Sequence, residues 1–295
     1  MILKSIITAL LGLTIYNIVV IQFFPNVKVS RHYWQENQIK AQTYVFGNST
    51  PDQVIVGSSL SARLNDKNLP GYGKLSFIGQ TVFEGFRVIL QRKDLPAKIF
   101  VETNYLLRPL SPDFNSSLEN PVLFYARSKM EGLRDEKQPL AIVSNKLDNL
   151  VKPVVNALAR SQAPGTKPSE TNPHFENALN NNIEASNRIV DSNEVEQRFA
   201  LLKTYVDRFV GRGAEVIFFE MPVHPKVAAC TIPKAIRKKM KEYFPPTVYK
   251  YIEQPDCTPY QTTDGIHLQL GEADTYAVYF TAMRDRIFSG LAKEK

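Results

Sequence analysis

The chain has 295 residues, of which 43% are hydrophobic and 22% are charged, a composition typical of a globular protein. Its 36 Lys and Arg residues outnumber its 29 Asp and Glu residues, but the two kinds are interspersed, so we expect no nucleic-acid partner. The sequence has no glycine-rich phosphate loop, and its two cysteines are too few and too far apart for a structural zinc site. We therefore set aside nucleotide-binding and zinc-binding classes, and we expect neither a metal nor a cofactor.

An uncharged apolar segment follows Lys4 and covers residues 5–24. About 20 apolar residues form a helix long enough to cross the bilayer core. The segment is longer than the apolar part of a signal peptide, and no small-residue cleavage pattern follows it. We therefore expect an uncleaved membrane anchor at residues 1–24. Basic residues lie on both sides of it, so charge alone does not orient it.

Short apolar runs alternate with helical patterns from residue 51 onward. Strands covered on both faces are typically such near-continuous apolar runs, and the alternation with helices predicts a parallel sheet between two layers of helices. The predicted fold is therefore an α/β three-layer sandwich with about five strands. The predicted strands cover residues 53–57, 74–79, 97–104, 214–222 and 247–253, and the main predicted helices cover 82–90, 195–209 and 276–287.

The domain organisation predicted from these patterns has three parts. Residues 25–50 read as a polar connector between the anchor and a sheet domain at 51–295. Residues 111–195 interrupt the strand–helix alternation and are predicted to be an insertion or lid, with an amphipathic helix near 147–158.

Polar residues follow several of the predicted strands. Ser59 follows the first strand, the second strand ends in Gly79 and the third in Asn104, while Asp264 and His267 lie in the loop after the last strand. Because the carboxyl ends of parallel strands share one edge of a sheet, we expect these residues to meet there. A hydroxyl, amide donors and a carboxylate–imidazole pair are the groups that a serine nucleophile, its oxyanion hole and its base require.

The order and spacing of these residues resemble the SGNH (GDSL-like) hydrolase superfamily, whose motif residues are Ser, Gly, Asn and His. The resemblance implies a flavodoxin-like fold and acyl transfer through a serine. It assigns Ser59 as nucleophile, His267 as base and Asp264 as the acid that orients it. It also assigns the oxyanion hole to the backbone N–H groups of Ser59 and Gly79 and to the side-chain amide of Asn104.

Two positions depart from the pattern of this superfamily. Ser58 stands where the first block usually has aspartate, a change common among membrane-anchored members that handle envelope glycans. Glu102 stands where the third block usually has glycine. Each motif residue also has a plainer interpretation, since Ser59 could be a turn or helix cap and Asn104 could bond its own backbone.

Three further residues have weaker assignments. His224 follows the fourth predicted strand and is a possible substrate contact, although no acid lies near it in the sequence. Cys230 and Cys257 could be two buried thiols or, outside the cytoplasm, a disulfide that braces loops around the site.

The anchor and the resemblance together imply a membrane-anchored, extracytoplasmic enzyme. We expect an O-acetyltransferase or O-acetylesterase whose substrate is a cell-envelope or exported polysaccharide. Its other partners would be an acyl donor and, for a transferase, a membrane protein that supplies it. The two departures leave a second interpretation open, a catalytically silent glycan-binding subunit of a polysaccharide modification or export assembly.

Overall fold

The computed structural model describes residues 2–23, 33–138 and 173–289. Contacts divide the chain into two units, one of Met1–Asn48 with Pro112–Thr166 and one of Ser49–Ser111 with Lys167–Lys295. We name them the N-terminal unit and the sheet unit. All the predicted site residues lie in the sheet unit.

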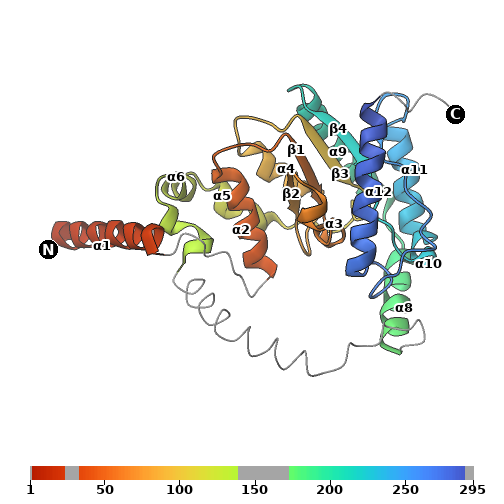
Figure 1. Cartoon of the computed structure of the whole chain (residues 1–295), viewed down its shortest axis with the longest axis horizontal. Coiled ribbons are helices and arrows are strands. Elements are labelled where there is room, and N and C mark those ends of the chain that lie inside the picture. Colours follow the sequence, from red (N-terminus) through yellow and green to blue (C-terminus); the bar gives the residue numbers. More distant parts are fainter. Residues whose placement is uncertain (1, 24–32, 139–172, 290–295) are drawn as a thin grey trace. The chain divides into compact units, whose positions relative to one another are not determined.

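The sheet unit contains a five-stranded sheet in which all strand pairs are parallel (Figure 1). The strand order is β2-β1-β3-β4-β5, the order found in flavodoxin-like doubly wound sheets. In such sheets ligands bind beside the first strand, where the winding direction reverses. The predicted parallel α/β sheet is thus confirmed, with its second strand shifted and its fifth strand shortened. The strands are β1 (Gln53–Gly57), β2 (Tyr72–Ser76), β3 (Lys98–Glu102), β4 (Glu215–Phe219) and β5 (Lys250–Tyr251).

Successive strand residues pack on opposite faces of the sheet. On one face, the rings of Phe100 and Phe219 lie 5.3 and 5.1 Å from the ring of Phe280, measured between centroids. On the other face, the neighbouring Phe218 lies 4.8 Å from Phe244. Burial on both faces explains why the strands are apolar runs rather than alternating patterns.

Helices cover both faces of this sheet. The predicted helices at 82–90, 195–209 and 276–287 correspond to α4, α9 and α12. Helix α4 begins at a capping box, in which the Thr81 hydroxyl accepts a hydrogen bond from the Phe83 N–H and the Glu84 carboxylate accepts one from the Thr81 N–H. The helices of the sheet unit are α3 (Ser59–Ala62), α4 (Val82–Leu90), α8 (Pro173–Asn187), α9 (Ser192–Val210), α10 (Pro225–Ala228), α11 (Thr231–Tyr243) and α12 (Leu270–Phe288).

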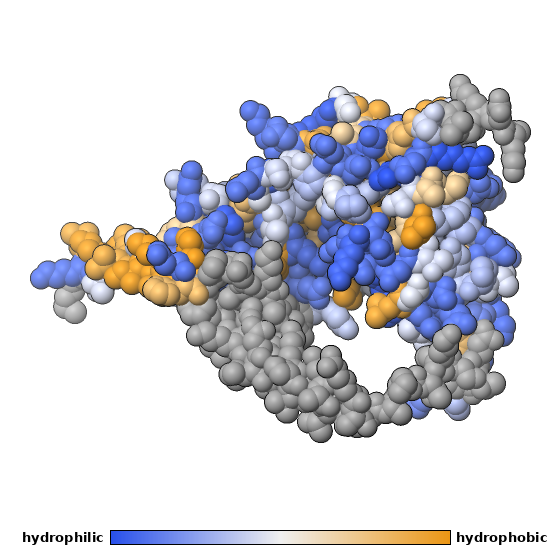
Figure 2. Space-filling model, in the orientation of Figure 1, coloured by the Kyte–Doolittle hydropathy of each residue, from blue (hydrophilic) through white to orange (hydrophobic). Residues whose placement is uncertain are grey.

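Helix α1 (Ile2–Phe23) is the apolar segment of the N-terminal unit. It is 22 residues long, and its length and composition are sufficient to span a membrane. Its large apolar side chains are exposed along most of its length (Figure 2). Two polar residues in its C-terminal half are paired, because the Tyr16 hydroxyl donates to the Lys137 carbonyl at 2.6 Å and the Gly132 N–H donates to the Asn17 side chain at 2.6 Å.

Part of the predicted insertion packs with the predicted connector rather than with the sheet. The connector contains α2 (Tyr33–Phe46). The segment after residue 112, which includes α5 (Ser116–Glu119) and α6 (Pro121–Lys129), belongs to the same unit and contacts α2. Buried amides make this contact: Gln38 donates to the Phe114 carbonyl at 2.5 Å, and Gln42 accepts from the Asp135 N–H at 2.9 Å. The remainder of the predicted insertion includes α8, which belongs to the sheet unit. The predicted helix at 147–158 lies outside the described residues.

Replacing Phe280 by Ala is expected to lower the free energy of unfolding by about 3–5 kcal/mol, because the ring fills the space between Phe100 and Phe219. Val278→Ala is the matched control, since Val278 is 63% exposed on the same helix. Urea unfolding of the full chain in detergent, followed by near-ultraviolet circular dichroism, measures both. Equal losses for the two variants would contradict this packing.

Candidate active site

Ser59 is the first residue of α3, directly after the sharp turn that leads from β1 into this helix. Gly57 ends the strand, and a Cβ at this position would collide with the Ser61 hydroxyl and the Glu102 carboxylate. Ser58 is the N-cap of α3, because its hydroxyl accepts a hydrogen bond from the N–H two residues later at 3.2 Å. Ser59 is therefore the first helical residue, just after the carboxyl end of β1, and is 9% exposed.

Glu102 is a buried carboxylate at the end of β3 that holds this turn. Its Oε2 accepts hydrogen bonds from the N–H groups of Ser58 and Ser61, both at 3.0 Å, and its Oε1 accepts one from the Ser58 hydroxyl at 2.5 Å. Hydrogen bonds to an ionised carboxylate are stronger than those between neutral groups. Ser58 and Glu102, the two positions singled out in the sequence analysis, are therefore hydrogen-bonded to each other.

Asp264 and His267 lie in a tight loop between β5 and α12. Asp264 Oδ1 accepts hydrogen bonds from the N–H groups of Ile266 at 3.1 Å and His267 at 2.8 Å. Gly265 has φ +94°, and a Cβ there would lie 2.6 Å from the Leu179 side chain. The loop thus needs glycine for two reasons, its backbone conformation and the lack of space.

Ser59, His267 and Asp264 form one continuous hydrogen-bonded chain. His267 Nε2 lies 2.9 Å from Ser59 Oγ, and His267 Nδ1 lies 2.6 Å from Asp264 Oδ2. Burial raises the pKa of Asp264, but the hydrogen bonds from the His267 ring and from the His267 and Ile266 N–H groups outweigh it and hold that pKa below its ordinary value. An ionised Asp264 can only accept, so Nδ1 carries the proton and Nε2 is free to take the proton of Ser59.

The three expected oxyanion donors differ in how firmly they are held. The Asn104 amide pairs with the backbone of Met221, donating to its carbonyl at 2.9 Å and accepting from its N–H at 2.8 Å, which leaves one amide proton free. Among the described residues, neither the Ser59 N–H nor the Gly79 N–H donates to a backbone carbonyl in a turn, loop or helix cap. Gly79 lies in an exposed turn with φ +80° and makes no hydrogen bond with Ser59 or His267, so its role stays a prediction.

His224 is hydrogen-bonded to the backbone of the loop that carries Asp264 and His267. Its N–H donates to the Gly265 carbonyl at 2.9 Å, and its Nδ1 accepts from the Lys226 N–H at 3.2 Å, which caps α10. A direct contact between His224 and substrate stays a prediction.

Cys230 and Cys257 are both free thiols, so the disulfide considered above is not formed. Cys230 is buried, and its thiol donates a hydrogen bond to the Lys226 carbonyl, with 3.2 Å between sulfur and oxygen. Burial raises the pKa of the Cys257 thiol. The structure shows two free thiols, of which Cys230 is buried and Cys257 is half-buried, so the alternative of two buried thiols holds for Cys230 only.

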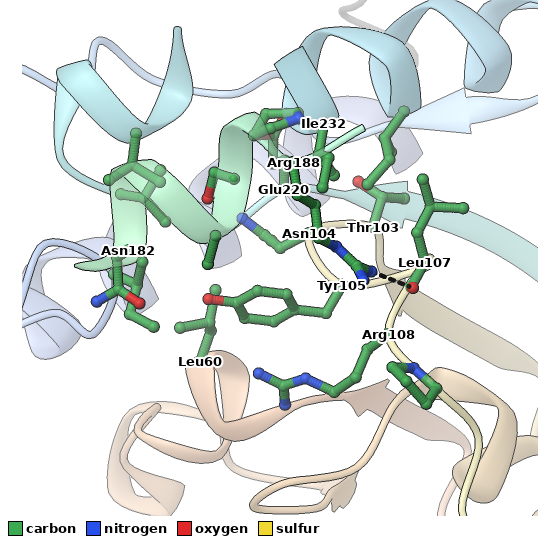
Figure 3. A pocket seen from close by; sticks show the side chains of 18 residues that line it. Leu60, Thr103, Asn104, Tyr105, Leu107, Arg108, Asn182, Arg188, Glu220 and Ile232 are labelled. Atoms are coloured by element: carbon green, nitrogen blue, oxygen red, sulfur yellow. Dashed lines mark hydrogen bonds between the residues drawn. The ribbon is translucent and has the colours of Figure 1, made fainter. Parts of the chain in front are cut away.

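We call Ser59, His267 and Asp264 the triad. A cavity of about 370 Å³ lies beside it (Figure 3). Its wall includes Leu60, which directly follows Ser59, Ile266, which directly precedes His267, and Asn104. Helices α8 and α11 contribute other parts of the wall. The sequence predicted neither helix as part of a site.

Two supporting residues escaped sequence reasoning because their contacts are distant in the chain. Asn182 on α8 donates from its amide to the Asp264 carbonyl at 2.8 Å, across 82 residues. Arg63, just after α3, donates to the Leu268 carbonyl at 2.7 Å, across 205 residues, and so ties the serine turn to the histidine loop. No local motif marks either residue.

No protein-family model matches the chain, and no curated protein matches it significantly. The candidate active site is therefore supported by its own geometry, above all by the chain of hydrogen bonds from Ser59 through His267 to Asp264.

Replacing Glu102 by Gly is expected to lower the rate at which a fluorophosphonate labels Ser59 by at least about tenfold, because the N–H groups of Ser58 and Ser61 lose their buried acceptor. Unfolding free energy should fall by about 2 kcal/mol or more. Adding Ser58→Asp to this variant returns an acid to the turn and should recover part of the labelling rate. Labelling of Glu102→Gly at the wild-type rate would show that the turn does not need this carboxylate.

The lowered pKa of Asp264 predicts how stability changes with pH. In the unfolded chain this pKa returns to about 3.9, so between the two values the unfolded state binds more protons and stability rises with pH. The contribution of Asp264 is present above the unfolded value and is lost as the pH falls through the folded value. Urea unfolding of the wild type and Asp264→Asn between about pH 3 and pH 5.5 should show a stability difference that grows with pH. A difference that shrinks or stays constant would contradict the lowered pKa.

Proposed function

We propose that this chain is a serine esterase or acyltransferase that acts through Ser59. The observation that carries the proposal is the 2.9 Å contact between Ser59 Oγ and His267 Nε2, with Asp264 behind the imidazole at 2.6 Å. The plainer role of helix cap is already filled by Ser58. The Ser59 hydroxyl is thus left to the imidazole.

The reaction follows from these contacts. As Ser59 Oγ attacks an ester carbonyl, His267 Nε2 takes its proton and Asp264 stabilises the imidazolium. The new Oγ–C bond moves an electron pair onto the carbonyl oxygen. When that pair returns, the C–O bond to the alcohol breaks, and the alcohol leaves with the proton from His267. Water or a sugar hydroxyl then attacks the acyl-serine by the same steps and restores Ser59.

The oxyanion formed in this step needs donors that are already oriented. We assign this role to the Ser59 N–H, the Gly79 N–H and the second amide proton of Asn104. Asn104 is the best supported of the three, because its pairing with Met221 fixes the plane of the amide.

Helix α1 supports a membrane-anchored enzyme, since it is long and apolar enough to span the bilayer. We propose that the sheet unit works outside the cytoplasm on an O-acylated cell-envelope or exported polysaccharide. The SGNH resemblance and the anchor imply that the acyl group is acetyl. A transferase would also need an acyl donor, supplied by a membrane partner. A catalytically silent glycan-binding subunit would need none of the contacts around Ser59.

Ser59→Ala is expected to abolish fluorophosphonate labelling and to lower hydrolysis of an aryl ester by at least about 10³-fold, as loss of a triad nucleophile does. His267→Ala should have a comparable effect, because Ser59 loses its base. Labelling followed by mass spectrometry, with ester turnover measured on the full chain in lipid nanodiscs, gives both values.

Ser61→Ala is the matched control, because its hydroxyl donates to Ser76 and not to His267. This variant should label like the wild type. If the wild type neither labels nor hydrolyses the ester, or if Ser59→Ala behaves like Ser61→Ala, the proposed function is wrong. Adding a glycan acceptor then shows whether the acyl group passes to sugar or to water.

A further inference from the structure

The cavity beside the triad has an aliphatic floor. Its members come from five different segments of the sheet unit, and each is at most 9% exposed. Sugar hydroxyls buried against such a surface would lack hydrogen-bond partners, at a considerable cost in free energy. The floor residues are Leu60, Leu107, Val223, Val227, Ile236 and Ile266.

The charged side chains that line the cavity either contact another side chain or are exposed to solvent. The Glu220 carboxylate accepts two hydrogen bonds from the Arg237 guanidinium, at 2.8 and 2.6 Å. Arg108 stacks on the Tyr105 ring, with 4.2 Å between its guanidinium carbon and the ring centroid. Arg188 is exposed and donates to a backbone carbonyl at 3.4 Å (Figure 3). The floor therefore presents aliphatic surface rather than charge to a ligand.

Two residues join the cavity to the triad. Asn182 lines the cavity and donates to the Asp264 carbonyl at 2.8 Å. Tyr105, which directly follows Asn104, also lines the cavity, and burial raises the pKa of its phenol although the charge of Arg108 opposes this. Figure 3 shows the Tyr105 hydroxyl directed to the side on which Asn182 lies. The cavity and the triad thus share a wall.

We infer that this cavity binds the acyl chain of the substrate and that this acyl group is longer than the acetyl group expected from the resemblance. The inference rests on the proposed acyl transfer through Ser59 and names the acyl group that is transferred. Leu60 directly follows Ser59 and Ile266 directly precedes His267, and both line the cavity, so an acyl group on Ser59 would extend into it. Acetyl would leave most of the cavity empty, whereas an unbranched chain of roughly four to eight carbons would cover the aliphatic floor.

The test compares p-nitrophenyl acetate, butyrate and hexanoate on the full chain in lipid nanodiscs. The value of kcat/KM should rise at least about tenfold from acetate to hexanoate, because each methylene removed from water contributes up to about fourfold. Ser59→Ala, measured with each ester, separates catalysis by this site from background hydrolysis.

Val227→Phe fills the cavity from its floor and should bring the hexanoate-to-acetate ratio close to one. Val278→Phe is the matched control, because Val278 is exposed on α12, and it should keep the wild-type ratio. Ala185→Phe narrows the cavity from an exposed position on α8, so it should lower the ratio even if Val227→Phe does not fold. Circular dichroism reports folding for each variant.

The outcomes distinguish this inference from the proposed function. Ser59-dependent hydrolysis with a flat or falling chain-length profile overturns the inference and leaves the proposed function standing. If no ester is hydrolysed, the proposed function fails, and calorimetry of hexanoate with the Ser59→Ala chain still tests the cavity. If adding Val227→Phe weakens the binding of hexanoate at least about tenfold, the result supports the cavity as the site of the acyl chain. Equal binding of hexanoate with and without Val227→Phe overturns that assignment.

Discussion

The buried carboxylate of Glu102 is the contact on which the position of Ser59 depends. It joins the end of β3 to the turn after β1 through three hydrogen bonds to Ser58 and Ser61. A buried carboxylate is costly unless it is paired, so these donors and the carboxylate constrain each other. Ser59, which lies between the two bonded residues, is thereby held at the edge of the sheet with its hydroxyl free for His267.

The histidine loop is held in place from several sides. Asp264 organises it from within, whereas Asn182 and His224 bond its backbone from neighbouring elements. Arg63 ties its far end to the segment that follows the serine turn. The short contacts of the triad therefore rest on a framework contributed by three separated parts of the chain. The same framework includes α8, so the histidine loop and the cavity wall are positioned together.

The sequence allowed the parallel sheet and three of the helices around it to be predicted, because strand and helix signals are local. Apolar runs marked the five strands, and helical spacing marked α4, α9 and α12. The N-terminal unit was predicted less well. There, α2 was read as a connector because its buried residues include Asn37, Gln38 and Gln42, whose amides give no apolar stripe. Their burial makes sense only with the carbonyls and N–H groups of the segment after residue 112 in place.

The sequence by itself determined the parallel sheet, the apolar N-terminal helix and the residues that follow each strand, because periodicity and strand ends are properties of neighbouring residues. Only the tertiary structure decided that Ser59 and His267, 208 residues apart, meet at hydrogen-bonding distance. It also decided that the Ser58 hydroxyl donates to Glu102 and that the two cysteines are free thiols. These outcomes depend on how strands from distant parts of the chain are ordered in the sheet, and strand order is set by packing of the whole unit rather than by any local pattern.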